Sequence, residues 1–231
     1  MSSHTIENYV KAIYLITTHQ ELTSNTGSRE SPPAASTGML AEALGVLPGS
    51  VTNMLKTLQA SGLADYRPYE GVTLTQAGQA LALRVLRRHR LIELFLCQTL
   101  SLTWDEVHEE AENMEHAVSD WLIDRIDNFL GMPATDPHGD PIPRPDGSIA
   151  ATDYVPLTTL NVGACFRLVR VMDQSVEFLK YLTDQGLEID SVSALVELAP
   201  SAGVLRIRRE TRDVVLAYEA AGKLMVRREP V

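Results

Sequence analysis

Residues 132–156, rich in proline and glycine, separate two parts of the chain whose apolar residues follow different periods. Before this segment, apolar residues recur at the three- and four-residue spacing of amphipathic helices. After it, short runs rich in β-branched residues, such as FRLVRV and VLRIRR, indicate strands joined by turns. Because proline and glycine interrupt both kinds of element, the segment itself predicts a linker with little regular structure. The chain is therefore expected to be mainly α, with a small β domain.

The N-terminal third predicts three helices and a hairpin. Helical spacing of apolar residues predicts helices over 5–17, 39–46 and 49–62, the last two closed by glycines. Residues 18–35 are polar and contain Pro-Pro, so they predict a flexible loop. Residues 63–75 hold two short extended runs around a turn, which indicates a β-hairpin. This order of elements is that of a winged helix-turn-helix.

In a helix-turn-helix the second helix enters the major groove of DNA with its N-terminal end. Val51, Leu55 and Leu58 predict the buried side of that helix, which leaves its polar residues on the outer side. Asparagine can read adenine, while hydroxyl groups and lysine can bind phosphate. The alternative is a short amphipathic helix with an ordinary polar face. The candidate DNA contacts, one of them from the hairpin, are Ser50, Thr52, Asn53, Lys56, Thr57 and Arg67.

The net charge of −10 is distributed unevenly. Residues 1–90 carry 8 basic and 6 acidic residues, and residues 157–231 carry 10 of each. Residues 91–156 carry only 2 basic residues against 14 acidic ones. The middle segment can therefore hold cations, and the N-terminal segment can still present a locally basic surface to phosphate.

Two long amphipathic helices are predicted over 75–100 and 103–130, the second ending at Gly131. Two such helices in succession suggest a helical hairpin with apolar surface of the kind that commonly dimerises. On the second helix four potential ligands fall within an arc of about 100°, beside the apolar stripe. Glu106, Glu109 and Glu110 point away, toward solvent. The four clustered residues are His108, Glu112, Glu115 and His116.

The preceding helix supplies a second pair, His89 and Glu93, at i and i+4. An antiparallel hairpin can bring this pair to the other four residues. Three imidazoles and three carboxylates suit Mn²⁺ or Fe²⁺, and Zn²⁺ or Co²⁺ could also fit. Because imidazole must be neutral and carboxylate ionised to ligate, metal binding should weaken as pH falls.

Two other interpretations of this cluster stay open. One is a solvated acidic helix with incidental histidines, which is what most charge runs are. The other is a metalloenzyme, but an HExxH zinc hydrolase would need histidine at 112, where the chain has glutamate. A ferritin-like di-iron site would need Glu-x-x-His on two helices, and residues 105–108 fit that motif poorly. We therefore expect a protein that is not an enzyme.

Several segments together resemble the diphtheria toxin repressor and manganese transport regulator family. They are ENYVKAIY, LAEALGVLPGSVTNMLKTLQASGL, EGVTLTQAGQALA, RRHRLIE, VHEEAENMEHAVSD and DPHGDPIP. The tail from Val155 looks like the SH3-like domain of FeoA-type proteins. The resemblance implies a winged helix-turn-helix DNA-binding domain, a helical metal-binding and dimerisation domain, a linker and an SH3-like β-barrel. Their expected ranges are 1–74, 75–131, 132–156 and 157–231.

By resemblance, the activity is metal-dependent repression. Mn²⁺ or Fe²⁺ would fix a homodimer in a shape that binds operator DNA near metal-transport genes, and so control metal homeostasis. A winged-helix regulator that does not respond to metal is the alternative. The implied primary ligands are Asn8, Glu112, Glu115 and His116. The implied ancillary ligands are His89, Glu93 and His108, completed by Gln174 and Glu177 from the SH3-like domain.

Two residues depart from the family pattern. Position 8 usually holds methionine or aspartate, and here Asn8 offers an uncharged amide oxygen. Lys11 stands where some manganese regulators use a bridging carboxylate, which argues against a binuclear arrangement. Glu112 replaces the cysteine of iron-type members, which favours manganese.

The remaining sequence features concern the location of the protein. No run of about 18 apolar residues predicts a membrane-spanning helix, and the N-terminus lacks the pattern of a signal peptide. Cys97 and Cys165 form no CxxC pair, which fits a reducing compartment. We therefore expect a cytoplasmic protein without a membrane partner.

Overall fold

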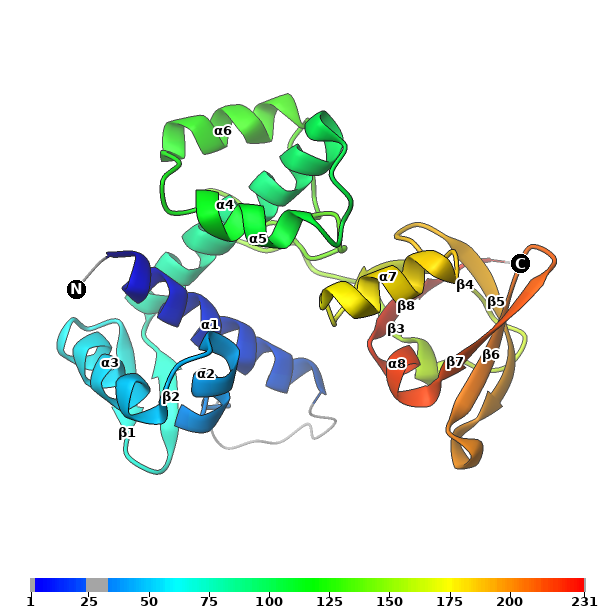
Figure 1. The fold of residues 1–231 in the computed structure, drawn as a ribbon, viewed down its shortest axis with the longest axis horizontal. Coiled ribbons are helices and arrows are strands. Elements are labelled where there is room, and N and C mark those ends of the chain that lie inside the picture. The colour runs from blue at the N-terminus through cyan, green and yellow to red at the C-terminus, as the bar shows by residue number, and fades with distance from the viewer. Residues whose placement is uncertain (1–2, 24–32, 231) are drawn as a thin grey trace. The chain divides into compact units, whose positions relative to one another are not determined.

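The computed structural model describes residues 3–23 and 33–230, and Figure 1 shows their fold. The chain divides into two compact units. The first unit comprises residues 1–88 with 143–148, and the second comprises residues 89–142 with 149–231. No helix among the described residues is long and apolar enough to cross a membrane.

The first unit has the predicted winged helix-turn-helix order. Ser36 caps α2 by accepting a hydrogen bond from the Met39 backbone N–H, and Gly45 ends α2 in the left-handed conformation. The two strands pair antiparallel, with Ala64 opposite Leu74. The elements are α1 (Ser3–Thr23), α2 (Thr37–Leu44), α3 (Pro48–Ala60), β1 (Ala64–Arg67) and β2 (Gly71–Leu74). Their shared core includes Val10, Ile13, Leu40, Leu55 and Val72.

Helix α1 is longer than predicted. Residues 18–23 continue the helix, so the prediction of a loop from residue 18 is wrong, and residues 24–32 lie outside the described residues. The Thr17 hydroxyl donates to the Ile13 and Tyr14 carbonyls within the helix, so this polar side chain does not end it. Glutamine, glutamate and leucine then follow, and all three favour helix.

Helix α4 (Gln76–Leu100) matches the helix predicted over 75–100, and the second unit begins within it, at residue 89. The single helix expected over 103–130 is wrong. Two helices form instead, α5 (Val107–Met114) and α6 (Asp120–Phe129), separated by turns. The break occurs because the Ser119 side chain accepts a hydrogen bond from the Leu122 N–H and caps a new helix. Leu122 of α6 is exposed.

Part of the predicted linker is a compact, buried turn. The Asp136 N–H donates to the Asp140 carbonyl, and the Asp136 carboxylate accepts from the backbone N–H groups of His138 and Asp140. All three of these side chains are buried. Residues 132–154 of the predicted linker form neither helix nor named strand, as expected, but its last two residues form strand β3 (Val155–Pro156) and residues 136–140 are fixed by these hydrogen bonds. We call residues 136–140 the ligand loop.

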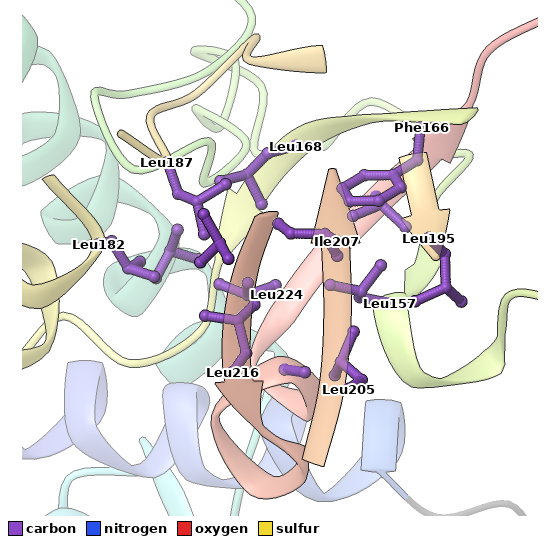
Figure 2. Packing of buried hydrophobic residues seen from close by; sticks show 14 of the residues in the cluster. Leu157, Phe166, Leu168, Leu182, Leu187, Leu195, Leu205, Ile207, Leu216 and Leu224 are labelled. Carbon is purple, nitrogen blue, oxygen red and sulfur yellow. The ribbon is translucent and has the colours of Figure 1, made fainter. Parts of the chain in front are cut away.

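A six-stranded antiparallel sheet forms the C-terminal part of the second unit, with strand order β3-β8-β4-β5-β6-β7. Alternating residues of the strands face a common core that includes Phe166, Leu168, Ile207 and Leu216, as Figure 2 shows. The strands are β3 (Val155–Pro156), β4 (Cys165–Val171), β5 (Val192–Ala199), β6 (Val204–Arg209), β7 (Arg212–Ala217) and β8 (Leu224–Arg228). The helices are η1 (Leu157–Thr159), α7 (Val176–Asp184), η2 (Pro200–Ala202) and α8 (Tyr218–Gly222).

Candidate metal centre

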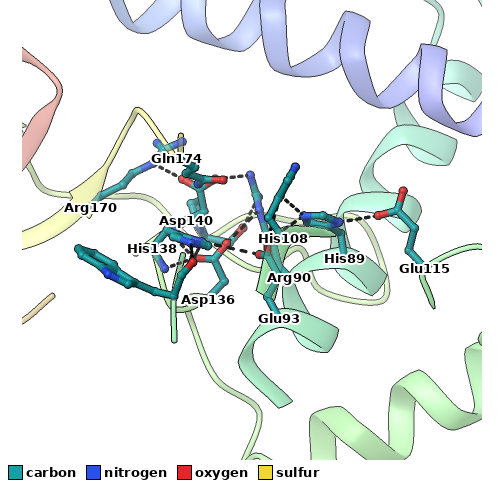
Figure 3. A network of polar contacts seen from close by, with 12 residues as sticks. His89, Arg90, Glu93, His108, Glu115, Asp136, His138, Asp140, Arg170 and Gln174 are labelled. Carbon is teal, nitrogen blue, oxygen red and sulfur yellow. Dashed lines mark hydrogen bonds and ion pairs between the residues drawn. The ribbon is translucent and has the colours of Figure 1, made fainter. Parts of the chain in front are cut away.

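His89 of α4 lies between two buried carboxylates. Its Nδ1 is 2.6 Å from Glu115 Oε2, and its Nε2 is 2.9 Å from Glu93 Oε1 (Figure 3). The side chains of Glu93 and Glu115 are 1% and 0% exposed. Carboxylates this deeply buried require a positive partner, because an unpaired charge is costly away from water.

The other predicted ligands of the second unit extend this arrangement. His108 Nδ1 lies 3.3 Å from Glu93 Oε1, and His108 Nε2 lies 3.9 Å from Glu112 Oε1. His116 Nε2 lies 3.4 Å from Glu115 Oε1. A continuous series of contacts thus joins the six residues of the histidine–carboxylate cluster, His89, Glu93, His108, Glu112, Glu115 and His116. Glu106, Glu109 and Glu110 are exposed, as predicted.

The ligand loop adds a histidine that sequence reasoning did not select. His138 is fully buried, and its ring stacks on Trp104. His138 Nε2 lies 2.7 Å from the Trp104 carbonyl oxygen, so it must donate a hydrogen there. In the neutral ring the lone pair is then on Nδ1, which lies 3.8 Å from Glu93 Oε2 and 3.9 Å from Asp136 Oδ1. Donation of a ring N–H to a backbone carbonyl in this way commonly orients a metal-ligating histidine.

The pKa values of the Glu93 and Asp136 carboxyl groups are shifted in opposite directions. Burial alone would raise the pKa of Glu93, but attraction to His89 and hydrogen bonds from His108 and His89 lower it overall. Burial raises the pKa of Asp136 well above its usual range, and repulsion from Asp140 and Glu93 adds to the effect. Burial also raises the pKa of the Cys97 thiol, to about 11, and the negative charges of Glu93 and Asp136 add to the effect.

Three groups of side chains among the described residues could each hold a metal ion, with donor atoms within 4.8 Å of one another. Imidazoles and carboxylates without a thiolate suit Mn²⁺ and Fe²⁺. His138 Nδ1 is buried without a hydrogen-bond partner and faces two carboxylates, a position that a cation would satisfy. The residues therefore fit a divalent metal. The groups are His89/Glu93/His108, His89/Glu112/Glu115 and Glu93/Asp136/His138.

Of the two ancillary ligands expected from the SH3-like domain, Glu177 belongs to none of these groups. Gln174 Nε2 donates to Asp140 Oδ2 at 3.3 Å, so its amide contacts the ligand loop. Glu177 is exposed in the first turn of α7. The sequence signal that could have found Asp136 and His138 is the DPHGDPIP motif, which places two carboxylates and an imidazole at alternate positions.

Asn8, the fourth predicted primary ligand, belongs to the first unit. Its Oδ1 atom is buried and has no hydrogen-bond partner among the described residues. A buried carbonyl oxygen is costly to leave unsatisfied, and an amide oxygen is a suitable ligand for a hard cation. Lys11, one turn further along α1, is also buried.

The predicted DNA contacts of α3 lie on one exposed face. Val51, Leu55 and Leu58 are fully buried, as predicted. On the opposite side the exposed residues Ser50, Asn53 and Lys56 follow one another at three-residue spacing. Thr52 and Thr57 are partly buried, and each donates its hydroxyl to a helix carbonyl four residues earlier. Arg67 is exposed on β1 and pairs with Glu70.

Three family models match consecutive parts of the chain. "Iron dependent repressor, N-terminal DNA binding domain" matches residues 1–72. "Iron dependent repressor, metal binding and dimerisation domain" matches residues 75–144, and "FeoA domain" matches residues 155–228. We call residues 155–228 the FeoA-type domain. The fold and the three matches define the class: this is a metal-dependent transcriptional repressor.

Individual relatives agree with the family models. The iron-dependent repressor IdeR of Mycobacterium leprae is 30% identical over 77% of this chain and 82% of that protein. The regulator MntR of Lysinibacillus sphaericus is 34% identical over 59% of this chain and 89% of that protein. A structure entitled "Manganese-dependent transcriptional repressor complex with manganese" is 36% identical, with a TM-score of 0.84, and the match covers 96% of this chain and 98% of that one. The chain belongs to the diphtheria toxin repressor and manganese transport regulator family.

Proposed function

We propose that this protein is a cytoplasmic homodimeric repressor that binds operator DNA when Mn²⁺ or Fe²⁺ occupies its metal sites. The observation that carries the proposal is the histidine–carboxylate cluster, in which Glu93 and Glu115 are buried against His89. The similarity to an iron-dependent repressor and to a manganese-dependent repressor supports both metals. A donor set without thiolate favours Mn²⁺. Nothing in the proposal requires catalysis.

Two metal sites are proposed. The primary site would use Glu112, Glu115 and His116 of the second unit, with Asn8 of the first unit supplying an amide oxygen. The ancillary site would be built on Glu93 with His89 and His108, and it extends to Asp136 and His138 of the ligand loop. His138 lies 3.8 Å from Glu93 and forms a group with it and Asp136, so the loop is proposed to supply ligands in addition to Gln174 and Glu177.

The proposed switch between metal-free and metal-bound states depends on primary ligands that come from two different parts of the chain. Asn8 belongs to the winged helix-turn-helix, whereas Glu112, Glu115 and His116 belong to the helices that would form the dimer body. Shared ligation removes freedom between these parts and fixes the separation of the two recognition helices, which the operator half-sites must match. The change affects DNA binding only if metal binds the DNA-competent state better than the other state.

The dimer surface is proposed on α6 and the residues after it. Large apolar side chains are exposed there, with Trp121 at 67%, Phe129 at 70% and Met132 at 61%. Three large apolar side chains exposed along one short segment are candidates for an interaction surface. The matched description of residues 75–144 as a dimerisation domain supports the same role.

DNA binding with and without metal tests the proposed function. A duplex selected from a random pool in the presence of Mn²⁺ would be labelled, and its affinity measured by fluorescence anisotropy with Mn²⁺, with Fe²⁺ under anaerobic conditions, and with a chelator. We expect tight binding only with metal. Equal affinity with metal and chelator would reject the switch and leave a regulator that does not respond to metal.

Replacing Lys56 with alanine should weaken DNA binding about equally for all sequences. Lys56 is exposed on the outer face of α3, where it can contact a phosphate. Loss of one phosphate contact should reduce the slope of log affinity against log salt by about 1. Titrations at several salt concentrations measure this slope. Lys180→Ala removes an exposed lysine of α7 and should leave the slope unchanged; a slope lowered equally by both changes would contradict a local role for Lys56.

A further inference from the structure

Asp140, at the end of the ligand loop, joins the helical part of the second unit to the FeoA-type domain. Its carboxylate accepts a hydrogen bond from Arg90 Nη2 of α4 at 3.0 Å and one from Arg170 Nε of β4, as Figure 3 shows. Arg90 and Arg170 are 4% and 8% exposed, so water screens these charges little. Arg170 also donates to the Tyr154 hydroxyl and lies over the Tyr154 ring.

The backbone of the ligand loop lies directly on β4. The Val171 N–H donates to the His138 carbonyl at 2.9 Å. Gly139 has a φ of +84°, and a Cβ at this position would lie 2.0 Å from the Val169 carbonyl oxygen. Only glycine permits so close an approach. The ligand loop carries Asp136 and His138, which lie near Glu93. Its backbone is thus fixed in position by contacts with β4 of the FeoA-type domain.

Trp104 also connects the ligand loop to the FeoA-type domain, through two hydrogen bonds. Its carbonyl accepts the hydrogen bond that orients His138, and its indole Nε1 donates to Thr183 Oγ1 of α7 at 3.0 Å. Movement of the FeoA-type domain would therefore disturb the orientation of His138 through Trp104 and the position of the loop through Asp140.

We propose that Asp140 and Arg170 are positioning residues, which couple docking of the FeoA-type domain to metal binding at Glu93, Asp136 and His138. The inference rests on the proposed function, since it concerns one of the proposed metal sites. In this arrangement the FeoA-type domain supports the site through its contacts with Asp140 and the ligand loop. Because coupling is reciprocal, metal at the site also stabilises the docked domain.

Because of the surrounding charges, we expect loss of Asp140 and loss of Arg170 to weaken metal binding by different amounts. Asp140 neutralises two buried guanidinium groups, and Arg90 also lies 3.7 Å from the carboxylate of Asp136. Asp140→Asn leaves both cations close to the site, where they oppose a divalent cation. Arg170→Met leaves Asp140 paired with Arg90 and removes only the connection to β4. Asp140→Asn should therefore weaken metal binding more than Arg170→Met.

Mn²⁺ binding to the full-length protein tests the proposal. Calorimetry gives the stoichiometry and affinity, and electron paramagnetic resonance follows the Mn²⁺ environment. Loss of a group that orients a ligand lowers metal affinity about 10- to 100-fold, and we expect Arg170→Met to weaken one class of site by this factor. Arg170→Lys keeps the charge and should lose less. The matched control is Arg167→Gln, which removes a half-exposed arginine of the same strand that pairs with Glu229. Unchanged affinity in folded Arg170→Met would overturn the proposal.

Hydrogen exchange on the wild-type protein tests the same coupling and does not depend on whether a variant folds. Mn²⁺ should slow exchange of the Val171 amide and of α7, measured against a chelator-treated sample. Metal binding at two sites without any such protection would overturn the coupling and leave the proposed function intact. If the wild-type protein binds no Mn²⁺ and no Fe²⁺, the proposed function itself is wrong.

Discussion

Replacing Glu112 or His116 with alanine should abolish the metal response of DNA binding while the protein stays dimeric. Each residue would supply one donor to the primary site, and Glu112 also lies in a group with His89 and Glu115 whose donor atoms are within 4.8 Å of one another. Loss of a group that merely supports a ligand costs about 10- to 100-fold in metal affinity, so loss of a ligand should cost at least that much. Anisotropy titrations across Mn²⁺ concentrations would measure the effect.

The control for this prediction is on the same helix. Glu109→Ala removes a carboxylate that is exposed on α5 and belongs to none of the three metal-binding groups. It changes the net charge by the same amount as Glu112→Ala, so it separates ligation from general electrostatics. Sedimentation would establish that all variants remain dimers. A full metal response in Glu112→Ala and His116→Ala would remove both residues from the primary site.

Residues at local helix boundaries made the DNA-binding element predictable from sequence. Glycine near the end of each short helix and apolar residues at helical spacing define α2 and α3 without knowledge of distant contacts. The side of α3 that is buried was predicted for the same reason, since Val51, Leu55 and Leu58 repeat along one stripe. The prediction succeeded because the ends and the buried faces of these helices are determined by residues close together in the sequence.

The break between α5 and α6 was not predicted, because the apolar and acidic pattern continues across it. Two features produce the break. Ser119 caps α6, and Glu115 is buried against His89, a residue 26 positions earlier in the chain. A sequence window sees a polar residue at 119 and a charged residue at 115, both compatible with a continuous helix. The contact that buries Glu115 depends on packing between α4 and the turn after α5.

The structure of the ligand loop also depends on contacts between residues far apart in the sequence, and to a greater extent. Proline and glycine in residues 132–156 indicate a linker by every local rule, and no periodicity predicts which of its side chains are buried. His138 is buried in contact with Trp104 and Val171, which lie more than 30 positions away on either side, and Asp136 lies beside Arg90 of α4. The position of Gly139 against β4 is equally non-local. Metal-ligating candidates on such a loop can be found only from the fold or from a motif already known.

Glu93→Gln should remove the ancillary metal site and also destabilise the metal-free protein. Glu93 is the one carboxylate shared by two of the three groups, since its two oxygens face His89 and His108 on one side and His138 on the other. Glutamine keeps the shape but removes the negative charge. Breaking a buried ion pair by changing one partner costs on the order of 3 kcal/mol, and we expect a loss of this size in the free energy of unfolding near neutral pH.

The pH dependence follows from the direction of the Glu93 shift. Its pKa in the folded protein is below the unfolded value, so its stabilising contribution is complete above the unfolded pKa and is lost as pH falls through the folded one. The stability difference between wild-type protein and Glu93→Gln should therefore shrink as the solution is acidified below a pH of about 4. Urea denaturation of chelator-treated protein at several pH values measures it. A difference that stays constant into strong acid would show that glutamine acts through packing instead of charge.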